Sequence, residues 1–135
     1  MFFLDTNILV YAWDARDPIK QAVARDLVRR AVIGEGVVSQ QVLSEFCSVL
    51  LHKLKPPTPA SQMLAALDSL AEIRLAPAGS GVVRRAVEAS QAYGVHFFDG
   101  LVIASAERDG CSRILSEDLN HGQFYFGVEV FNPFR

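Results

Sequence analysis

Four carboxylates of this 135-residue chain stand where acidic side chains are unusual: Asp5, Glu45, Asp99 and Asp118. Asp5 and Asp118 each follow a short apolar run, whereas Glu45 and Asp99 lie on or beside the apolar faces of segments with helical spacing. A carboxylate that faces a protein core is costly unless it is paired with a base or bound to a cation. No obvious basic partner accompanies any of the four, so they are candidate ligands of a cation.

The elements that would position these acids alternate along the chain. Strands are predicted at 2–5, 36–39, 73–76, 113–116 and 128–131, and helices at 7–13, 18–34, 40–54, 60–70, 82–93 and 99–108. Helices of this length between strands imply parallel crossovers, so we expect a three-layer α/β/α fold around a mainly parallel sheet of about five strands. Ligands of such sheets bind beyond the carboxyl ends of the strands. Asp5 and Asp118 would meet at that edge.

Start signals support two of the helices. Asp17 followed by Pro18 is the pattern of an N-cap and a first helical residue, and Ser39 can cap the helix at 40–54. Three prolines within residues 55–59 predict a loop, because proline fixes φ and removes a backbone donor.

Each acid also has a purely structural explanation. Asp5 and Asp99 could cap the helices that follow them, Glu45 could face solvent, and Asp118 could form an Asx turn. The fold prediction nevertheless places Asp5 and Asp118 at one edge of the sheet, which favours a shared site over four separate explanations.

The segments that carry these acids resemble those of a known family. "FLDTNILVYA", "LSEF", "FFDGLVIASA", "ILSEDLNHGQ" and the closing "VFNPF" are similar, in this order, to the motifs of PIN domains, specifically the VapC-like ribonuclease toxins of bacterial toxin-antitoxin pairs. The resemblance spans the whole chain. It implies the following site residues: the acidic quartet Asp5, Glu45, Asp99 and Asp118 as catalytic metal ligands, Asn7 and Ser116 as supporting polar residues, and Glu117 as an auxiliary acid. Gly100 stands where alanine is common in the family and could loosen the start of its helix.

The chemistry that suits these residues is metal-assisted hydrolysis. Carboxylate oxygens favour Mg²⁺ or Mn²⁺, which are held by few carboxylates together with waters and substrate phosphate. Zinc is not expected, because the three histidines show no ligand spacing and neither cysteine has a partner. A bound Mg²⁺ lowers the pKa of its water and neutralises charge on the reacting phosphate. Cleavage of an RNA phosphodiester would then leave a 5′-phosphate and a 3′-hydroxyl.

The charge balance is compatible with an RNA substrate. The formal net charge is −2, from 13 basic and 15 acidic residues. Removing the quartet leaves eleven acids against thirteen bases, a remainder of +2. Three basic clusters could bind phosphates or could be ordinary solvated helix faces; they are Arg25, Arg29 and Arg30, then Lys53 and Lys55, then Arg84 and Arg85.

Composition limits the class of protein. The length predicts a single domain at 1–135, and half of the residues are hydrophobic, as in ordinary globular proteins. Cys47 and Cys111 form no CxxC pair and are expected to be free thiols. The N-terminus has no basic leader, and no apolar run has the roughly 18 residues of a membrane span. We therefore expect a cytoplasmic protein with no membrane partner.

Other functions remain as alternatives. A catalytically inactive PIN scaffold that only binds a partner would keep the same residues. A phospho-receiver domain would need paired acids after its first strand and a lysine after its last, where this chain has "DTN" and "NPF". The "GSG" at 79–81 is no dinucleotide fingerprint, because Arg84 occupies the third glycine position. No GxSxG motif or Cys/His pair supports a nucleophilic enzyme. The favoured interpretation is a metal-dependent endoribonuclease toxin, and the resemblance implies a cognate antitoxin partner and a homodimer.

Overall fold

Short apolar strands form the centre of the molecule. The computed structural model describes all 135 residues and contains β1 (Phe2–Leu4), β2 (Gly36–Val38), β3 (Arg74–Leu75), β4 (Arg113–Leu115), β5 (Phe124–Tyr125) and β6 (Val128–Phe131). They form one sheet in the order β3-β2-β1-β4-β6-β5, in which only β5 is antiparallel to its neighbour. Phe3, Val37 and Ile114 are completely buried, as expected of a parallel sheet covered on both faces.

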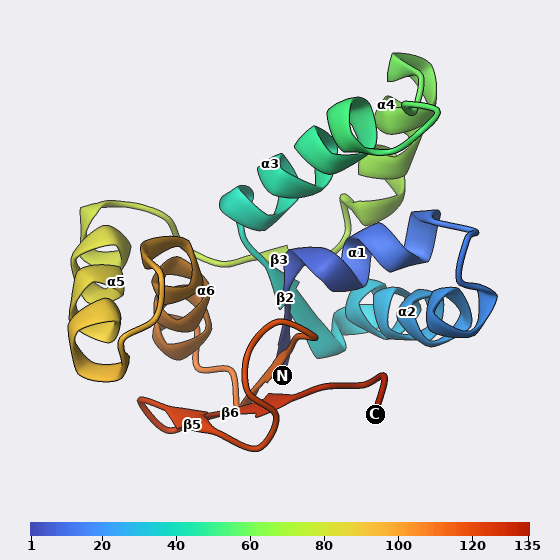
Figure 1. Cartoon of the computed structure of the whole chain (residues 1–135). Coiled ribbons are helices and arrows are strands. Elements are labelled where there is room, and N and C mark those ends of the chain that lie inside the picture. Colours follow the sequence, from blue (N-terminus) through green and yellow to red (C-terminus); the bar gives the residue numbers. More distant parts are fainter.

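Helices connect the first four strands and cover the sheet. They are α1 (Thr6–Trp13), α2 (Pro18–Arg30), η1 (Ala31–Glu35), α3 (Gln40–Ser48), η2 (Val49–Lys53), α4 (Ala60–Leu70), α5 (Ser80–Tyr93) and α6 (Phe97–Arg108). Figure 1 shows α1 and α2 on one side of the sheet, α5 and α6 on the other, and α3 and α4 extending beyond the strand ends. The result is the three-layer α/β/α arrangement that the sequence predicts. No helix is both long and apolar enough to span a membrane.

Local signals explain where several helices begin. The Asp17 side chain accepts a hydrogen bond from the Lys20 amide, with Pro18 as the first helical residue, and Ser39 accepts one from the Val42 amide. Both caps confirm the sequence prediction. Cys47 and Cys111 are free thiols, as also predicted.

Three details differ from the sequence prediction. The sheet has a sixth strand, β5, which forms a tight hairpin with β6 through Phe126 and Gly127, and both of these residues have positive φ. The helix expected at 18–34 is divided into α2 and the wider helical turn η1, and the helix expected at 40–54 is divided into α3 and η2. Helix α6 begins at Phe97 rather than at Asp99, because the His96 ring nitrogen caps it by accepting from the Phe98 amide at 3.2 Å.

Gly100 allows α5 and α6 to pack closely. A β-carbon added at this position would lie 2.6 Å from the carbonyl oxygen of Ala86, a backbone atom of α5. Such a contact is too short for any residue with a side chain. The close packing of α5 against α6 therefore requires a glycine at this position. This steric role differs from the expectation that Gly100 would loosen the start of α6.

Candidate active site

Asp5 is the single residue between β1 and α1. It is the N-cap of α1, and its Oδ1 accepts a hydrogen bond from the Thr6 amide at 2.7 Å. Its Oδ2 accepts another from the hydroxyl of Ser116, also at 2.7 Å. Only 6% of the residue is exposed. Asp5 is thus a helix cap and, at the same time, an acid at the carboxyl edge of the sheet.

Asn7 and Ser116 join the ends of β1 and β4. The Asn7 amide nitrogen donates to Asp118 Oδ2 at 3.1 Å, and the Asn7 Oδ1 accepts from the Glu117 amide at 3.2 Å. The Ser116 oxygen accepts from the backbone amides of Asp118 at 3.1 Å and Leu119 at 3.3 Å. Ser116, rather than Asp118, therefore forms the side-chain bonds of this turn. The contacts hold Asp5 and Asp118 beside each other, as their strand ends predict.

Glu45 and Asp99 approach the same region from helices. Glu45, on α3, accepts hydrogen bonds from the Thr6 hydroxyl at 2.9 Å and from the side-chain Nε2 of Gln41 at 2.8 Å. Asp99 is the third residue of α6, in its first turn, where the helix dipole favours a negative charge. Its carboxylate has no hydrogen-bond partner within the protein. Glu45 is therefore anchored to α1, whereas Asp99 is positioned only by its helix.

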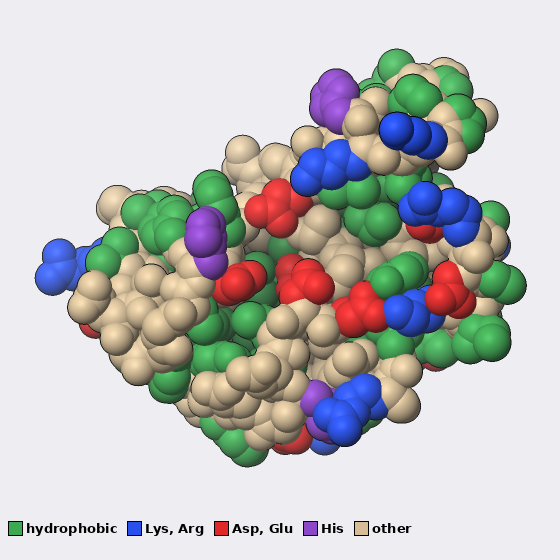
Figure 2. Space-filling view, in the orientation of Figure 1, with side chains coloured by type: hydrophobic (Ala, Val, Ile, Leu, Met, Phe, Trp, Pro, Cys, Tyr) green, Lys and Arg blue, Asp and Glu red, His purple; other side chains and the backbone are tan.

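Two of the four carboxylates, Asp5 and Asp99, have raised pKa values. Burial is the main cause that raises the pKa of Asp5 to about 6, with smaller contributions from the charges of Asp118 and Asp99. Burial also raises the pKa of Asp99, and the charges of Asp118 and Glu45 add to the effect. No lysine or arginine forms an ion pair with any member of the quartet. Figure 2 shows acidic side chains in a row across this face.

A cation of the magnesium type fits this set of donors. No three of the carboxylates, histidines or cysteines converge closely enough to hold a metal ion together. Mg²⁺ does not need such a cage, because it keeps several waters and is usually bound by one or two carboxylates and a substrate phosphate. A buried carboxylate with a raised pKa and no basic partner is the kind of group that a cation would stabilise. The donors are all oxygens, which suits magnesium or manganese.

The PIN domain family model matches residues 2–127 of the chain. The chain belongs to the PIN domain family. No curated protein sequence matches it significantly.

Several solved structures share the fold of this PIN domain. A toxin-antitoxin complex from Klebsiella pneumoniae matches with a TM-score of 0.72, 17% identity and coverage of 98% of both chains. FitAcB from Neisseria gonorrhoeae matches with a TM-score of 0.69, 19% identity and coverage of 99% of both chains. Mycobacterium tuberculosis VapC20, described as a sarcin-ricin loop cleaving toxin, has a TM-score of 0.65, 18% identity and coverage of 87% of this chain and 90% of its own. At these identities the likeness establishes the fold alone.

Glu117 is turned away from the quartet in this PIN domain. Its Oε2 accepts a hydrogen bond from the Tyr11 hydroxyl at 2.6 Å, and its Oε1 forms an ion pair with Lys20. Burial raises the pKa of Glu117, but the hydrogen bonds from Lys20 and Tyr11 outweigh it, so the pKa is lowered overall. Glu117 therefore fastens the turn after β4 to α1 and α2.

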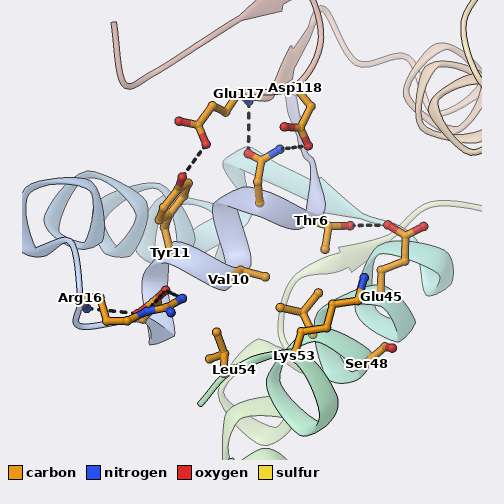
Figure 3. A pocket seen from close by; sticks show the side chains of 13 residues that line it. Thr6, Val10, Tyr11, Arg16, Glu45, Ser48, Lys53, Leu54, Glu117 and Asp118 are labelled. Carbon is orange, nitrogen blue, oxygen red and sulfur yellow. Dashed lines mark hydrogen bonds and ion pairs between the residues drawn. The ribbon is translucent and has the colours of Figure 1, made fainter. Parts of the chain in front are cut away.

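A groove runs from the acids along α1. We call it the α1–α3 groove. It has a volume of about 630 Å³ and is lined by Thr6, Asn7, Val10, Tyr11, Asp14, Arg16, Glu45, Ser48, Val49, Lys53, Leu54, Glu117 and Asp118. Figure 3 shows α1 on one side of this groove and α3 with η2 on the other. Asp99 does not line it, so the groove leads away from the quartet on the side of Glu45 and Asp118.

Three arginines of the predicted basic clusters are paired with nearby acids. Arg29 pairs with Asp26, and Arg30 pairs with Glu35. Arg85 binds Glu107 through two hydrogen bonds and stacks on Phe126, 3.6 Å from the ring centroid. Lys53 and Lys55 have no ion pair, so the second cluster is the one in which no charge is paired with an acid, although Arg25 and Arg84 in the other clusters also lack an ion pair.

Sequence reasoning missed several residues that hold the site together. They are Thr6, Tyr11, Lys20 and Gln41. Gln41 carried a usable signal, because it stands four residues before Glu45 and so shares its helix face. Lys20 carried none, since only the tertiary packing of α2 against α1 brings it to Glu117.

Proposed function

We propose that this PIN domain is a metal-dependent endoribonuclease and the toxin of a toxin-antitoxin pair. The observation that supports it best is the acidic quartet itself. Asp5 and Asp118 follow two strands, Glu45 and Asp99 lie on two helices, and none of the four forms an ion pair with a lysine or arginine. A structural role alone gives no reason to gather four unpaired carboxylates, whereas a cation and a phosphate would compensate them.

In the proposed reaction, carboxylates of the quartet would hold Mg²⁺ or Mn²⁺, which would supply an activated water and stabilise charge on the phosphate. Asp5 is kept in one orientation by Ser116 and the Thr6 amide. Asn7 orients Asp118 in the same way. Asp99 has both oxygens free to hold the cation or orient the attacking water. Cleavage would leave a 5′-phosphate and a 3′-hydroxyl on the RNA.

The partners proposed here rest on the family and on its relatives. A toxin-antitoxin complex and a toxin that cleaves the sarcin-ricin loop are among the structures with this fold. We propose that a cognate antitoxin covers the acidic face, that the protein forms a homodimer, and that it acts in the cytoplasm. Arginine suits such an inhibitor, because its planar guanidinium can pair bidentately with a carboxylate.

The test is cleavage of RNA by the purified protein. We expect cleavage with Mg²⁺ or Mn²⁺, none with EDTA, and none with Asp118→Asn. Asp68→Asn, on the exposed surface of α4, is the matched control and should cleave like the wild type. Full activity in EDTA, or activity restored only by Zn²⁺, would contradict the metal assignment. Binding of an antitoxin without any cleavage would instead support an inactive scaffold.

A further inference from the structure

A second cavity lies between α3, α5, α6 and the loop that joins β3 to α5. Its volume is about 260 Å³, and it shares no lining residue with the α1–α3 groove. The first turn of α3, from Ser39 to Gln41, and Gly79 at the start of α5 both line it. Figure 1 shows the loop from β3 to α5 passing close to this turn of α3. Two helix N-termini, each with a positive partial charge, therefore border a cavity that no acidic side chain lines.

The start of α5 has no side-chain cap. Its N-cap residue is Gly79, which has no side chain to accept from the first amides of the helix. The backbone amides of Ser80 and Gly81 have no acceptor in the preceding loop. The "GSG" at 79–81 is thus no dinucleotide fingerprint, but it leaves donors free for an anion.

Ser105 supplies a buried hydroxyl without a partner. It lies on α6, lines the cavity and is only 4% exposed. A helical serine can donate to the carbonyl four residues earlier, as Ser69 does to Ala65 at 3.2 Å. The Ser105 hydroxyl forms no hydrogen bond of any kind in the structure. Buried polar groups are nearly always paired, so this hydroxyl indicates a polar ligand in the cavity.

Gln41 adds an unsatisfied acceptor. Its Oε1 is buried and has no hydrogen-bond partner, whereas its Nε2 donates to Glu45 at 2.8 Å. A phosphate group that carries one proton can accept hydrogen bonds from hydroxyls and amides and can donate its own proton to such an oxygen. This combination of several donors and one acceptor suits a phosphate group.

Arg108 adds positive charge beside the start of α5. It follows Ser105 by three residues, so the two side chains share a face of α6. Arg108 does not line the cavity, but a β-carbon added to Gly81 would lie 3.0 Å from its guanidinium. It forms no ion pair, and the preceding Glu107 is bound by Arg85. The charge at this helix start is therefore not neutralised.

We propose that this cavity binds a phosphate group, supplied by free phosphate or by the terminal phosphate of a nucleotide. The amides at the two helix starts and the hydroxyl of Ser105 donate to its oxygens, and Arg108 balances its charge. The inference does not depend on the proposed nuclease function, because no member of the quartet lines the cavity. Gln41 links the two regions, so a bound phosphate would fix the side chain that holds Glu45.

The experiment measures phosphate binding by the full-length protein without divalent cations. Inorganic phosphate and, separately, AMP are titrated by isothermal calorimetry in EDTA, so that no metal can connect a phosphate to the quartet. At least one of them should bind saturably with a Kd below about 10 mM. Similar or tighter binding of inorganic phosphate would identify free phosphate as the ligand. Binding of AMP that is about tenfold tighter would identify a nucleotide.

Three variants test the residues of the cavity. Ser105→Ala should weaken binding about tenfold, because it removes one hydrogen bond to a charged group. Its melting temperature without phosphate should equal that of the wild type, since the hydroxyl has no partner to lose. Arg108→Gln should weaken binding about threefold. Ala78→Trp, at an exposed lining position, should fill the cavity and abolish binding.

Matched controls make the same changes outside the cavity. Ser61→Ala, Ser61→Trp and Lys55→Gln alter exposed residues that do not line it, and all three should bind phosphate like the wild type. Absence of saturable binding of either ligand would overturn the inference, as would wild-type affinity in Ser105→Ala and Ala78→Trp. A protein that cleaves RNA but binds no phosphate in EDTA would reject this site and leave the nuclease function intact.

Discussion

The two sides of the acidic site are built differently. At the strand ends, the side chains of Ser116 and Asn7 and the Thr6 amide bind Asp5 and Asp118 in a continuous hydrogen-bonded network. At α6, the carboxylate of Asp99 has no such bond. Hydrogen bonds therefore hold Asp5 in place, whereas none holds Asp99.

This difference allows the contribution of each acid to folding to be distinguished from its proposed role in catalysis. Asp5 is a helix cap as well as a proposed ligand, so changes around it must affect folding. Asp99 has no structural partner to lose, and burial and neighbouring acids raise its pKa despite an opposing effect of His96. Stability measurements in the absence of metal should therefore distinguish the two sides, even though loss of either carboxylate is expected to abolish activity.

The largest effect is expected from Ser116→Ala. Ser116 is completely buried, donates to Asp5 and accepts from the amides of Asp118 and Leu119. Its loss removes a hydrogen bond from the buried Asp5 carboxylate, from the buried Leu119 amide and from the partly buried Asp118 amide, and should cost about 3 kcal/mol of unfolding free energy. The melting temperature should fall by about 10 °C. Urea denaturation without metal would measure the change.

Ser44→Ala is the matched control for this substitution. Ser44 is exposed on α3 and its hydroxyl has no hydrogen bond in the structure. Its unfolding free energy should stay within about 0.5 kcal/mol of the wild type. If Ser116→Ala were equally harmless, the network at the strand ends would not be the rigid side of the site.

Asp5→Asn should change stability in the opposite direction. The pKa of Asp5 is raised from 3.8 to about 6 in the folded protein. Its contribution to stability is therefore present below pH 3.8 and is lost as the pH rises through about 6. Asn removes the buried charge at nearly the same volume. Above pH 6 the metal-free variant should be more stable than the wild type by about 1 kcal/mol, or a few degrees in melting temperature.

The gain for Asp5→Asn should vanish near pH 4, where the wild-type carboxyl is protonated. Thermal melts across this pH range would measure it, and Asp68→Asn should show no such pH dependence. Added Mg²⁺ or Mn²⁺ should stabilise the wild type and have much less effect on Asp5→Asn. A variant that is less stable at pH 8 and still cleaves RNA would identify Asp5 as a cap only.

The smallest effect on metal-free stability is expected from Asp99→Asn. No hydrogen bond is lost, so the unfolding free energy should change by less than about 0.5 kcal/mol. The stabilisation by Mn²⁺ should nevertheless fall clearly, because one proposed ligand loses its charge. Melting curves with and without Mn²⁺ provide both values. A large loss of stability without metal would reveal structural support for Asp99 that the hydrogen bonds do not account for.

The sequence predicted the parts of this site that depend on regular elements. Asp5 and Asp118 follow parallel strands, and the carboxyl ends of neighbouring strands necessarily lie at one edge. The caps at Asp17 and Ser39 are local and were equally predictable. Asp99 was expected as a possible cap, but His96 takes that role.

What the sequence left open depends on contacts between elements. Lys20 meets Glu117 only because α2 packs against α1, and no local pattern indicates that pair. The strand β5 is two residues long and is formed by its pairing with β6, which no local pattern predicted. Arginines that looked available for RNA are bound by acids such as Glu35 and Glu107. Charge clusters in a sequence therefore overestimate the charge that is free to bind a ligand.

The close contact of Gly100 with Ala86 determines which mutations on α5 and α6 change the spacing of the two helices. Backbone meets backbone at this point, so exposed side chains of α5 such as Val83 and Val87 can be exchanged without altering the spacing of the two helices. A single methyl group at residue 100 would push the helices apart, and α6 would carry the neighbouring carboxylate of Asp99 with it. The alignment of the Asp99 carboxylate therefore depends on the absence of a side chain at residue 100.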